Sequence, residues 1–198
     1  MATFIVSDWH CGDPRLEILG RPFSNTKQMI EVLVRNHNYL VKKDDTVIVA
    51  GDVCCDKTPD FLKYVNEFNG NKILIRGNHD RIFSDDELLK YFQKIIPEGE
   101  GINLTVGDLK CFVTHYPTRG KEDRFTVCGH VHSAYRVQLN TFNCGIDANH
   151  FYPTNSEKIP FIFKAICEYY DEDVWCAYKE INKKYLGIRG KKGSYFQK

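Results

Sequence analysis

Three short runs rich in apolar, β-branched residues lie in the first 75 positions. They are Phe4-Ile5-Val6, Thr46–Val49 and Lys72–Ile75, and none shows the alternation of a half-exposed strand. Such runs are typical of strands buried on both faces, as in a parallel sheet covered by helices. The segments between them have helical character, so the sequence predicts a β-α-β-α-β arrangement.

Helix signals separate these strands. Apolar residues recur at helical spacing over 25–40, with Asn25 or Ser24 as the N-cap. Pro59 is expected to open a second helix that stops near Asn69-Gly70. A third helix is expected from Ser84 to about Ile95.

The pattern changes to strands from residue 102. Segments 102–106 and 110–114, joined by Gly107-Asp108, predict a hairpin. Segments 124–128, 134–139 and 141–144 are expected to add strands to a mostly antiparallel half. We expect one domain over residues 1–163, with a C-terminal helical extension and basic tail, 164–198, packing on it; a solvated tail is the simplest account of those basic residues.

Composition excludes several protein classes. The 198 residues are 42% hydrophobic and carry a net charge of +1, which argues against a disordered chain. No apolar run approaches the ~20 residues of a membrane-spanning helix, so no membrane association is expected. Met1-Ala2 leads straight into the first strand without a secretory signal, which predicts a cytoplasmic protein whose eight cysteines are reduced.

Metal-competent side chains stand just past the ends of five predicted strands. Carboxyl ends of strands are where α/β sheets gather their ligand groups, so these side chains are expected to meet in one crevice. The set is Asp8, His10, Asp52, Asn78, His115, His130 and His132. It offers oxygen and imidazole donors and no thiolate, which suits two divalent ions, with manganese favoured and iron, nickel, zinc or cobalt as alternatives.

The order of these motifs resembles the calcineurin-like metallophosphoesterases. The motifs are Asp8-Trp9-His10, Gly51-Asp52, Gly77-Asn78-His79-Asp80, His115 and Gly129-His130-Val131-His132. Arg21-Pro22-Phe23, His115-Tyr116-Pro117 and Gly145-Ile146-Asp147 are most similar to a small bacterial and phage branch, whose proteins are expected in the cytoplasm of the bacterium or the infected host. The resemblance covers residues 3 to about 160 and implies a four-layer α-β-β-α sandwich of two mixed sheets flanked by helices.

The same resemblance implies roles for individual residues. One ion would bind Asp8, His10, Asp52 and His132, and the other Asp52, Asn78, His115 and His130, with Asp52 bridging. His79 would protonate the leaving oxygen or stabilise the transition state. Arg76 matches an arginine that holds a phosphate oxygen in related protein phosphatases, with an ordinary ion pair as the alternative.

Departures from the protein-phosphatase motif argue against a phosphoprotein substrate. Asp52 is followed by Val53-Cys54-Cys55-Asp56, so the usual carboxylate partner of the catalytic histidine is missing at its spacing; Asp56 or Asp80 could replace it. Asp13 and Arg119 are candidate substrate contacts, with a turn residue and a solvated cation as the alternatives.

The expected function is hydrolysis of a small phosphodiester, such as a cyclic or linear nucleotide, or of a phosphomonoester, by attack of metal-bound hydroxide. Two alternatives stay open. A nuclease acting on DNA or RNA fits the six basic residues among the last 16, although nucleic acid is not the favoured partner. A non-catalytic scaffold of the same fold is disfavoured by His79. The oligomeric state does not follow from the sequence.

Overall fold

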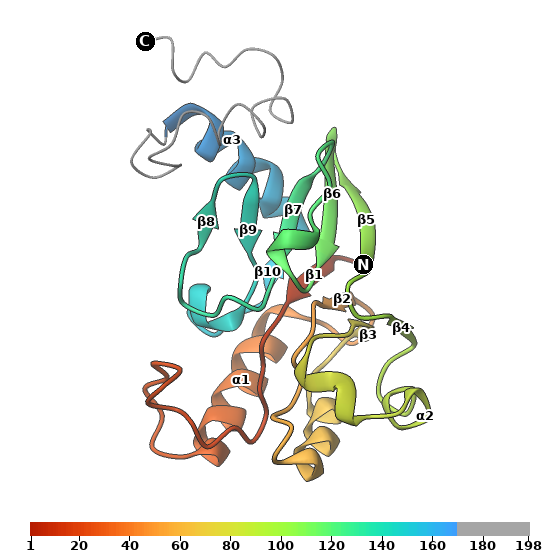
Figure 1. Ribbon diagram of the computed structural model, residues 1–198, viewed down its shortest axis with the longest axis vertical. Coiled ribbons are helices and arrows are strands. Elements are labelled where there is room, and N and C mark those ends of the chain that lie inside the picture. Colours follow the sequence, from red (N-terminus) through yellow and green to blue (C-terminus); the bar gives the residue numbers. More distant parts are fainter. Residues whose placement is uncertain (170–198) are drawn as a thin grey trace.

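The computed structural model describes residues 1–169, which form two five-stranded β-sheets flanked by helices (Figure 1). The strands are β1 (Thr3–Val6), β2 (Thr46–Val49), β3 (Asn71–Ile75), β4 (Lys94–Ile96), β5 (Gly101–Val106), β6 (Leu109–Thr114), β7 (Phe125–Cys128), β8 (Val137–Gln138), β9 (Thr141–Asn143) and β10 (Thr154–Asn155). The helices are α1 (Thr26–Leu40), α2 (Asp85–Leu88) and α3 (Ile159–Tyr169), with short 3-10 turns η1 (Pro59–Glu67), η2 (His79–Ile82), η3 (Pro117–Arg119), η4 (Ile146–Ala148) and η5 (Ser156–Lys158).

The first sheet has the order β10-β1-β2-β3-β4. β1 to β4 are parallel, and β10, which the sequence patterns did not predict, pairs antiparallel with β1. The register places Val6 opposite Val49 and Val49 opposite Leu74. The carboxyl ends of these strands therefore lie level at one edge of the sheet.

The second sheet has the order β5-β6-β7-β9-β8. β5 and β6 form the predicted hairpin, and β8 pairs antiparallel with β9. The expected mostly antiparallel half is wrong in its centre, where β6, β7 and β9 are parallel. The long connections 115–124 and 129–140 return the chain to the starting edge, so three carboxyl ends lie together here as well.

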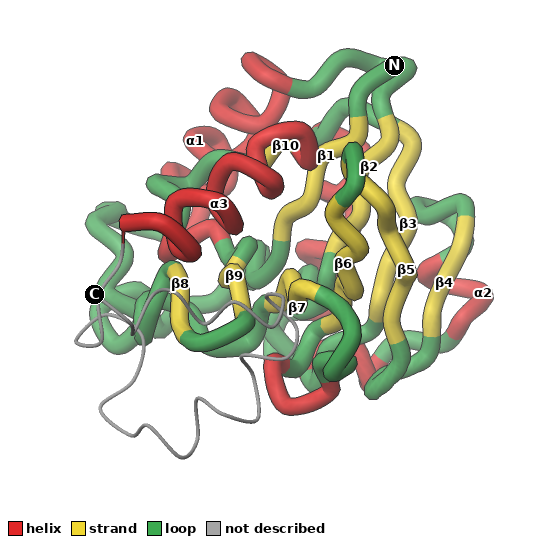
Figure 2. The backbone as a smooth tube through the Cα atoms, turned by 90° about the horizontal axis from the view of Figure 1, so that it is seen from above, coloured by secondary structure: helices red, strands yellow, loops and turns green. Residues whose placement is uncertain are grey.

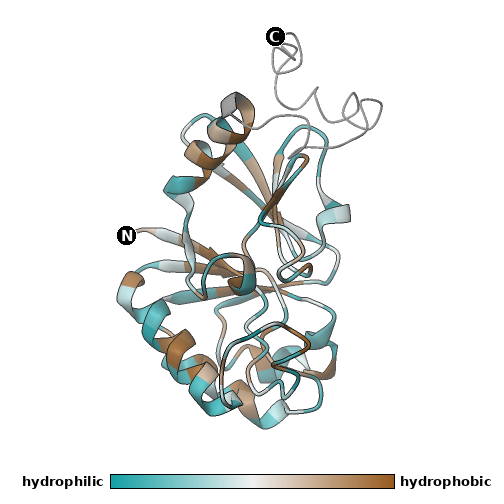
Figure 3. Cartoon of the chain, turned by 90° about the vertical axis from the view of Figure 1, so that its left-hand side faces the viewer, coloured by the Kyte–Doolittle hydropathy of each residue, from teal (hydrophilic) through white to brown (hydrophobic). Residues whose placement is uncertain are grey.

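Two hydrophobic cores explain why the buried strands are apolar on both faces. Phe4 and Val6 of β1 belong to a core shared with α1 and η1, whereas Ile5 belongs to the core shared with the second sheet. Figure 3 shows hydrophobic strands at the centre and alternating hydrophobic and hydrophilic colours along the helices outside them. Burying one large aliphatic side chain of such a core contributes roughly 2 kcal/mol.

Helix α1 begins where the sequence predicts it. The Asn25 side chain accepts a hydrogen bond from the Gln28 backbone N–H, and Met29, Ile30 and Leu33 are buried. The cap compensates one of the N–H groups left free at the helix start. The buried face holds α1 against the first sheet.

The two shorter helical segments differ from expectation. The segment after Pro59 is the 3-10 helix η1, and α2 ends at Leu88 although a helix to about Ile95 was expected. Residues 94–96 instead form β4 along β3. Ile95 packs in one core and Ile96 in the other, which is the period-two pattern of a strand between two layers.

Helix α3 lies over the β8–β9 end of the second sheet (Figures 1 and 2). Ile159 and Ile166 are buried in the core between the sheets, and the Phe163 ring meets the Phe125 ring at 5.1 Å. α3 begins five residues before the expected start of the C-terminal extension, and the rest of that extension, 170–198, lies outside the described residues. Within residues 1–169 no helix has the length and apolarity needed to cross a bilayer.

Candidate metal centre

The expected donors lie in five loops, each at the carboxyl end of a parallel strand. Asp8 and His10 follow β1, Asp52 follows β2, Asn78 follows β3, His115 follows β6, and His130 and His132 follow β7. Three loops come from the first sheet and two from the second, so the crevice lies where the two sheets meet.

Five of these seven residues have a left-handed backbone, which is uncommon for residues other than glycine. Their φ angles are 61° for Asp8, 47° for His10, 56° for Asp52, 73° for His130 and 48° for His132. Such conformations cost on the order of 1–3 kcal/mol each and persist where the surroundings enforce them, often at functional sites. The concentration of strain in this crevice marks it as the functional centre.

Glycines let these loops approach one another closely. A Cβ on Gly77 would overlap the Asp52 carboxylate and lie 2.8 Å from the His115 ring. A Cβ on Gly129 would overlap the Ser7 hydroxyl and lie 2.8 Å from Asp8 Oδ2. Real Cβ contacts are not this short, so both positions require glycine.

Asp52 lies between the two groups of donors. Its Oδ2 atom is 3.5 Å from His10 Nε2 and 3.4 Å from His115 Nε2, while Oδ1 accepts the His79 backbone N–H at 2.9 Å. Burial alone would raise the pKa of Asp52, but contacts with His10 and His115 hold it well below its usual range. This placement is what a bridging carboxylate needs.

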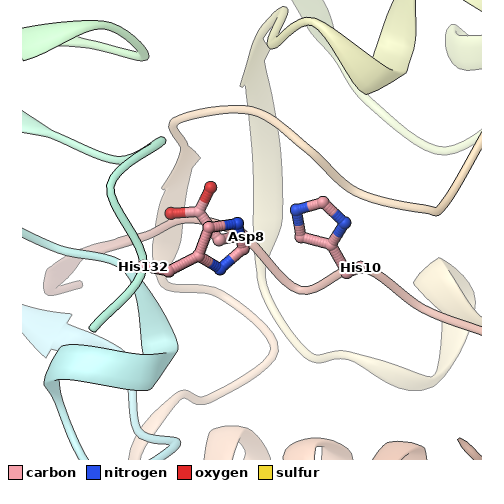
Figure 4. Close-up of side chains that lie close together, drawn as sticks. All are labelled: Asp8, His10 and His132. Carbon is pink, nitrogen blue, oxygen red and sulfur yellow. The ribbon is translucent and has the colours of Figure 1, made fainter. Parts of the chain in front are cut away.

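One group consists of Asp8, His10 and His132 (Figure 4). One donor atom from each lies within 4.8 Å of the others. The His10 and His132 ring centroids are 4.9 Å apart. The Asp8 carboxylate also accepts the His130 backbone N–H at 3.1 Å, which ties β1 to the loop after β7.

A second group consists of Asp52, His115 and His130, again with donor atoms within 4.8 Å, and His10, Asp52 and His79 form a third that overlaps the first two. Asn78 Oδ1 lies 3.3 Å from His115 Nε2, and His130 Nδ1 lies 3.2 Å from the same atom. The opposite nitrogen, His115 Nδ1, donates to the Ala50 carbonyl at 2.7 Å. His115 therefore presents its Nε2 lone pair to the crevice.

His10 provides a direct test of fit for a metal ion. Its side chain is buried, and neither ring nitrogen has a hydrogen-bond partner among the described residues. Burial would lower the pKa of His10, but close contacts with the Asp13 and Asp52 carboxylates raise it to about 9. A buried imidazole with unbonded nitrogens between carboxylates suits a divalent cation, as does the oxygen and nitrogen donor set.

The neighbouring cysteines are not suited to ligation. Cys11, Cys54, Cys55 and Cys128 are buried free thiols. Burial raises the pKa of the Cys128 thiol to about 12, so it stays protonated at neutral pH. Thiolates, not thiols, bind metals, and these residues act as small apolar groups.

His79 lies at the edge of the centre with a carboxylate behind it. Its ring centroid is 4.8 Å from that of His10, and its Nδ1 is 3.3 Å from Asp56 Oδ1. Asp80, the other candidate partner, is fully buried and accepts the backbone N–H groups of Asp52, Val53 and Gly77. Asp56 therefore faces His79, whereas Asp80 fastens the β2 and β3 loops together.

The three candidate substrate contacts lie in different settings. Arg76 donates to the Asp80 carbonyl and to Asp85 Oδ1 at 2.6 Å. It therefore forms the ordinary ion pair that was the alternative to a phosphate contact. Asp13 is buried, bonded to Arg15 and 3.4 Å from His10 Nδ1. Arg119 is exposed at the end of η3, and its contact with substrate stays a prediction.

Two further residues that contact the donor set, Arg21 and Asp147, were given no role from the sequence. Asp147 accepts from His132 Nδ1 at 2.7 Å, and Arg21 bonds Asp147. Tyr116 packs its ring 4.7 Å from that of His130. Asp147 stands past the end of β9, a position that signalled the other donors, so the same argument could have singled it out.

Comparisons with known proteins agree with this geometry. Residues 1–176 match the calcineurin-like phosphoesterase family. An uncharacterized protein, MJ1445, of Methanocaldococcus jannaschii is 30% identical over 91 residues, 44% of this chain and 52% of that protein. The Gene 66 protein of Mycobacterium phage L5 is 32% identical over 81 residues, 39% of each chain. The alignments thus span about half of the archaeal relative and less of the phage one.

A solved structure shares the fold. It is that of AQ665, a protein of unknown function from Aquifex aeolicus, with a TM-score of 0.62 and 21% identity, covering 81% of this chain and 98% of that one. The similarity confirms two mixed sheets with flanking helices. With the match over most of its length and the donors gathered at the strand ends, this chain belongs to the calcineurin-like phosphoesterase family of metal-dependent phosphoester hydrolases.

Proposed function

We propose that the protein hydrolyses a small phosphodiester, such as a cyclic or linear nucleotide, with two divalent ions held in this crevice. The observation that carries the proposal is the convergence of the two donor groups on Asp52. One ion would be held by Asp8, His10, Asp52 and His132, and the other by Asp52, Asn78, His115 and His130. Manganese is the favoured metal for this mixture of carboxylate, amide and imidazole donors.

The metal pair, when bound, polarises the phosphoryl group and makes a water-derived nucleophile available at neutral pH. The burial of the surrounding side chains suits this role. Asp52 and His10 are buried, whereas His79 and His132 are partly exposed and His130 is exposed. The centre is therefore closed on the protein side and accessible where a phosphoester would approach.

His79 is proposed as the catalytic acid. Asp56 at its Nδ1 orients the ring and favours a proton on that nitrogen. Nε2 is then the atom that approaches the substrate and gives a proton to the leaving oxygen. A positioned acid of this kind typically contributes about 10²- to 10⁴-fold in rate.

The experiment is a substrate and metal panel on the full chain. Bis-p-nitrophenyl phosphate, p-nitrophenyl phosphate and cyclic nucleotides are incubated with manganese, nickel, zinc and magnesium. We expect diester hydrolysis with manganese and its loss in His79→Ala. Activity on the monoester alone would overturn the diesterase preference, and a chain inert in every combination would favour the scaffold alternative.

The nuclease alternative is separated by a second substrate set. Binding of single-stranded DNA or RNA that weakens steeply with salt would favour it, because phosphate contacts release counterions. We expect no such binding at physiological salt. The cytoplasmic location expected from the sequence stays a prediction.

A further inference from the structure

A buried ion pair lies directly behind one side of the proposed metal centre. Arg21, in the connection between β1 and α1, donates from Nε to Asp147 Oδ1 at 2.8 Å and from Nη2 to Asp147 Oδ2 at 3.0 Å. The Arg21 side chain is 0% exposed and that of Asp147 3% exposed. A charged pair is expensive to bury, and two parallel bonds are the geometry that offsets the cost best.

Asp147 fixes the tautomer of His132, a proposed metal ligand. Its Oδ2 atom is 2.7 Å from His132 Nδ1. An ionised carboxylate only accepts hydrogen bonds, so Nδ1 carries the proton and Nε2 keeps its lone pair. A carboxylate on the far nitrogen of a ligating histidine sets the tautomer, orients the ring and strengthens the donor.

Arg21 also holds the loop that carries two more proposed ligands. Its Nη2 donates to the Asp8 carbonyl at 2.7 Å, and its Nη1 donates to the Trp9 carbonyl at 2.9 Å. Asp8 and His10 in this loop have φ angles of 61° and 47°. The guanidinium thus fastens a strained backbone and, through Asp147, the ring of His132.

The second donor group has a different support. His115 Nδ1 donates to a backbone carbonyl, that of Ala50. Within residues 1–169 no hydrogen bond joins Arg21 or Asp147 to Asn78, His115 or His130. The buried pair therefore acts on one half of the centre.

We infer that Arg21 and Asp147 are positioning residues that assemble the ion site of Asp8, His10 and His132, and that their loss weakens this site selectively. The inference rests on the proposed two-metal function. Unlike that function, the inference predicts unequal effects on the two ions. Metal-binding measurements can resolve this difference without any substrate.

The test is calorimetric titration of metal-free protein with Mn²⁺. Wild type is expected to bind two ions. Asp147→Asn keeps the size of the side chain but removes its charge, and is expected to weaken one ion about 10- to 100-fold while leaving the other within about threefold. Asp45→Asn is the matched control, because Asp45 is a buried carboxylate whose hydrogen bonds within residues 1–169 come from the backbone N–H groups of Ala2 and Lys42.

A second measurement separates positioning from a general loss of stability. Long-range ¹H–¹⁵N spectra of metal-free protein in alkaline solution should show His132 protonated on Nδ1 in wild type and Asp45→Asn, and a mixture of tautomers in Asp147→Asn. If Asp147→Asn does not fold, Arg21→Lys serves instead, because an ammonium cannot bond both oxygens of Asp147 and two carbonyls at once.

Each outcome decides a different claim. If wild type binds no divalent ion, the proposed function fails. If wild type binds two ions and the variants bind both as tightly, or lose both equally, the inference about Arg21 and Asp147 is wrong while the two-metal centre stands. Selective loss of one ion with an altered His132 tautomer supports it.

Discussion

Asp56 Oδ1 lies 3.3 Å from His79 Nδ1, although one residue follows β2 and the other follows β3. The contact supplies the carboxylate partner that is missing at the spacing found in protein phosphatases. The loop 53–56 brings this carboxylate to His79. A carboxylate at Nδ1 holds the orientation of the ring that is proposed to meet the substrate.

Asp56→Asn tests this contact. Because the amide keeps the shape but loses the charge, we expect turnover of the diester to fall about 10-fold or more, within the range of acid catalysis. Mn²⁺ binding should stay as in wild type, since within residues 1–169 the Asp56 carboxylate contacts His79 and Cys55 and no proposed ligand. Asp60→Asn, at the exposed start of η1, is the control. Wild-type turnover in Asp56→Asn would show that His79 needs no carboxylate.

Gly77→Ala tests whether close approach of the loops is required for the centre. The added methyl would overlap the Asp52 carboxylate and lie 2.7 Å from the Asp52 backbone nitrogen. We expect the β2 and β3 loops to separate and the affinity for both ions to fall, because Asp52 is shared. Equilibrium dialysis against Mn²⁺ measures the loss.

Gly107→Ala is the companion variant for Gly77→Ala. Gly107 has a φ of 57°, and no atom of the described part of the chain lies within 4 Å of an added Cβ, so a substitution there costs only backbone strain. Such strain amounts to about 1 kcal/mol. Its metal binding should equal that of wild type. Equal metal affinities in the two variants would contradict the packing argument.

Asp80→Asn tests the fastening of the two loops. The buried carboxylate accepts three backbone N–H groups, from Asp52, Val53 and Gly77. An amide would turn its NH₂ group against at least one of these donors and leave that buried N–H without an acceptor, which costs about 1–3 kcal/mol. We expect the free energy of unfolding to fall by about that amount. Urea denaturation measures it, and an unchanged midpoint would show that the loops are held by other contacts.

The donor set could be predicted from the sequence because its physical cause is local. Asp8, Asp52 and Asn78 each follow a buried strand of a parallel sheet, and parallel strands bring their carboxyl ends to one edge. The β1, β2 and β3 strands were recognisable from apolar runs without alternation. Their order and direction then placed these three side chains at one edge of the sheet without any tertiary information.

What could not be predicted depends on pairing between distant segments. Residues 94–96 continue a helical pattern in the sequence, yet they form β4 because Ile95 and Ile96 enter two different cores beside β3. The contact of Asp56 with His79 depends on the path of a loop, and the pair of Arg21 and Asp147 joins positions 126 residues apart. Spacing along the chain carries no signal for such contacts.

A buried histidine outside the proposed metal centre is expected to limit the acid stability of the protein. His37 on α1 is buried against the stacked rings of Trp9 and Phe68, meeting both edge-on, and its Nε2 donates to the Asn69 carbonyl at 2.9 Å. Burial lowers the pKa of His37 to about 4, with a smaller opposing effect of the Asn69 bond and a further lowering by Lys72.

Proton linkage determines whether stability rises or falls with pH. The unfolded chain takes up a proton at this residue near its ordinary pKa of about 6.5, whereas the folded chain resists protonation until about 4. The unfolded state therefore binds more protons between these values. Stability from this group is fully present above about 6.5 and is lost as the pH falls towards 4, by on the order of 3 kcal/mol.

His37→Gln removes the titrating ring while leaving an amide that can donate to Asn69. We expect the unfolding free energy, measured by urea titrations at several pH values, to fall less steeply between pH 6.5 and 4. The change in slope should correspond to about one fewer proton taken up on unfolding. Leu40→Ala on the same helix should lower stability at every pH and keep the wild-type slope, because it removes no ionisable group. An unchanged slope in His37→Gln would mean that the imidazole accepts its proton within the folded protein, which the packing of Trp9 and Phe68 around it argues against.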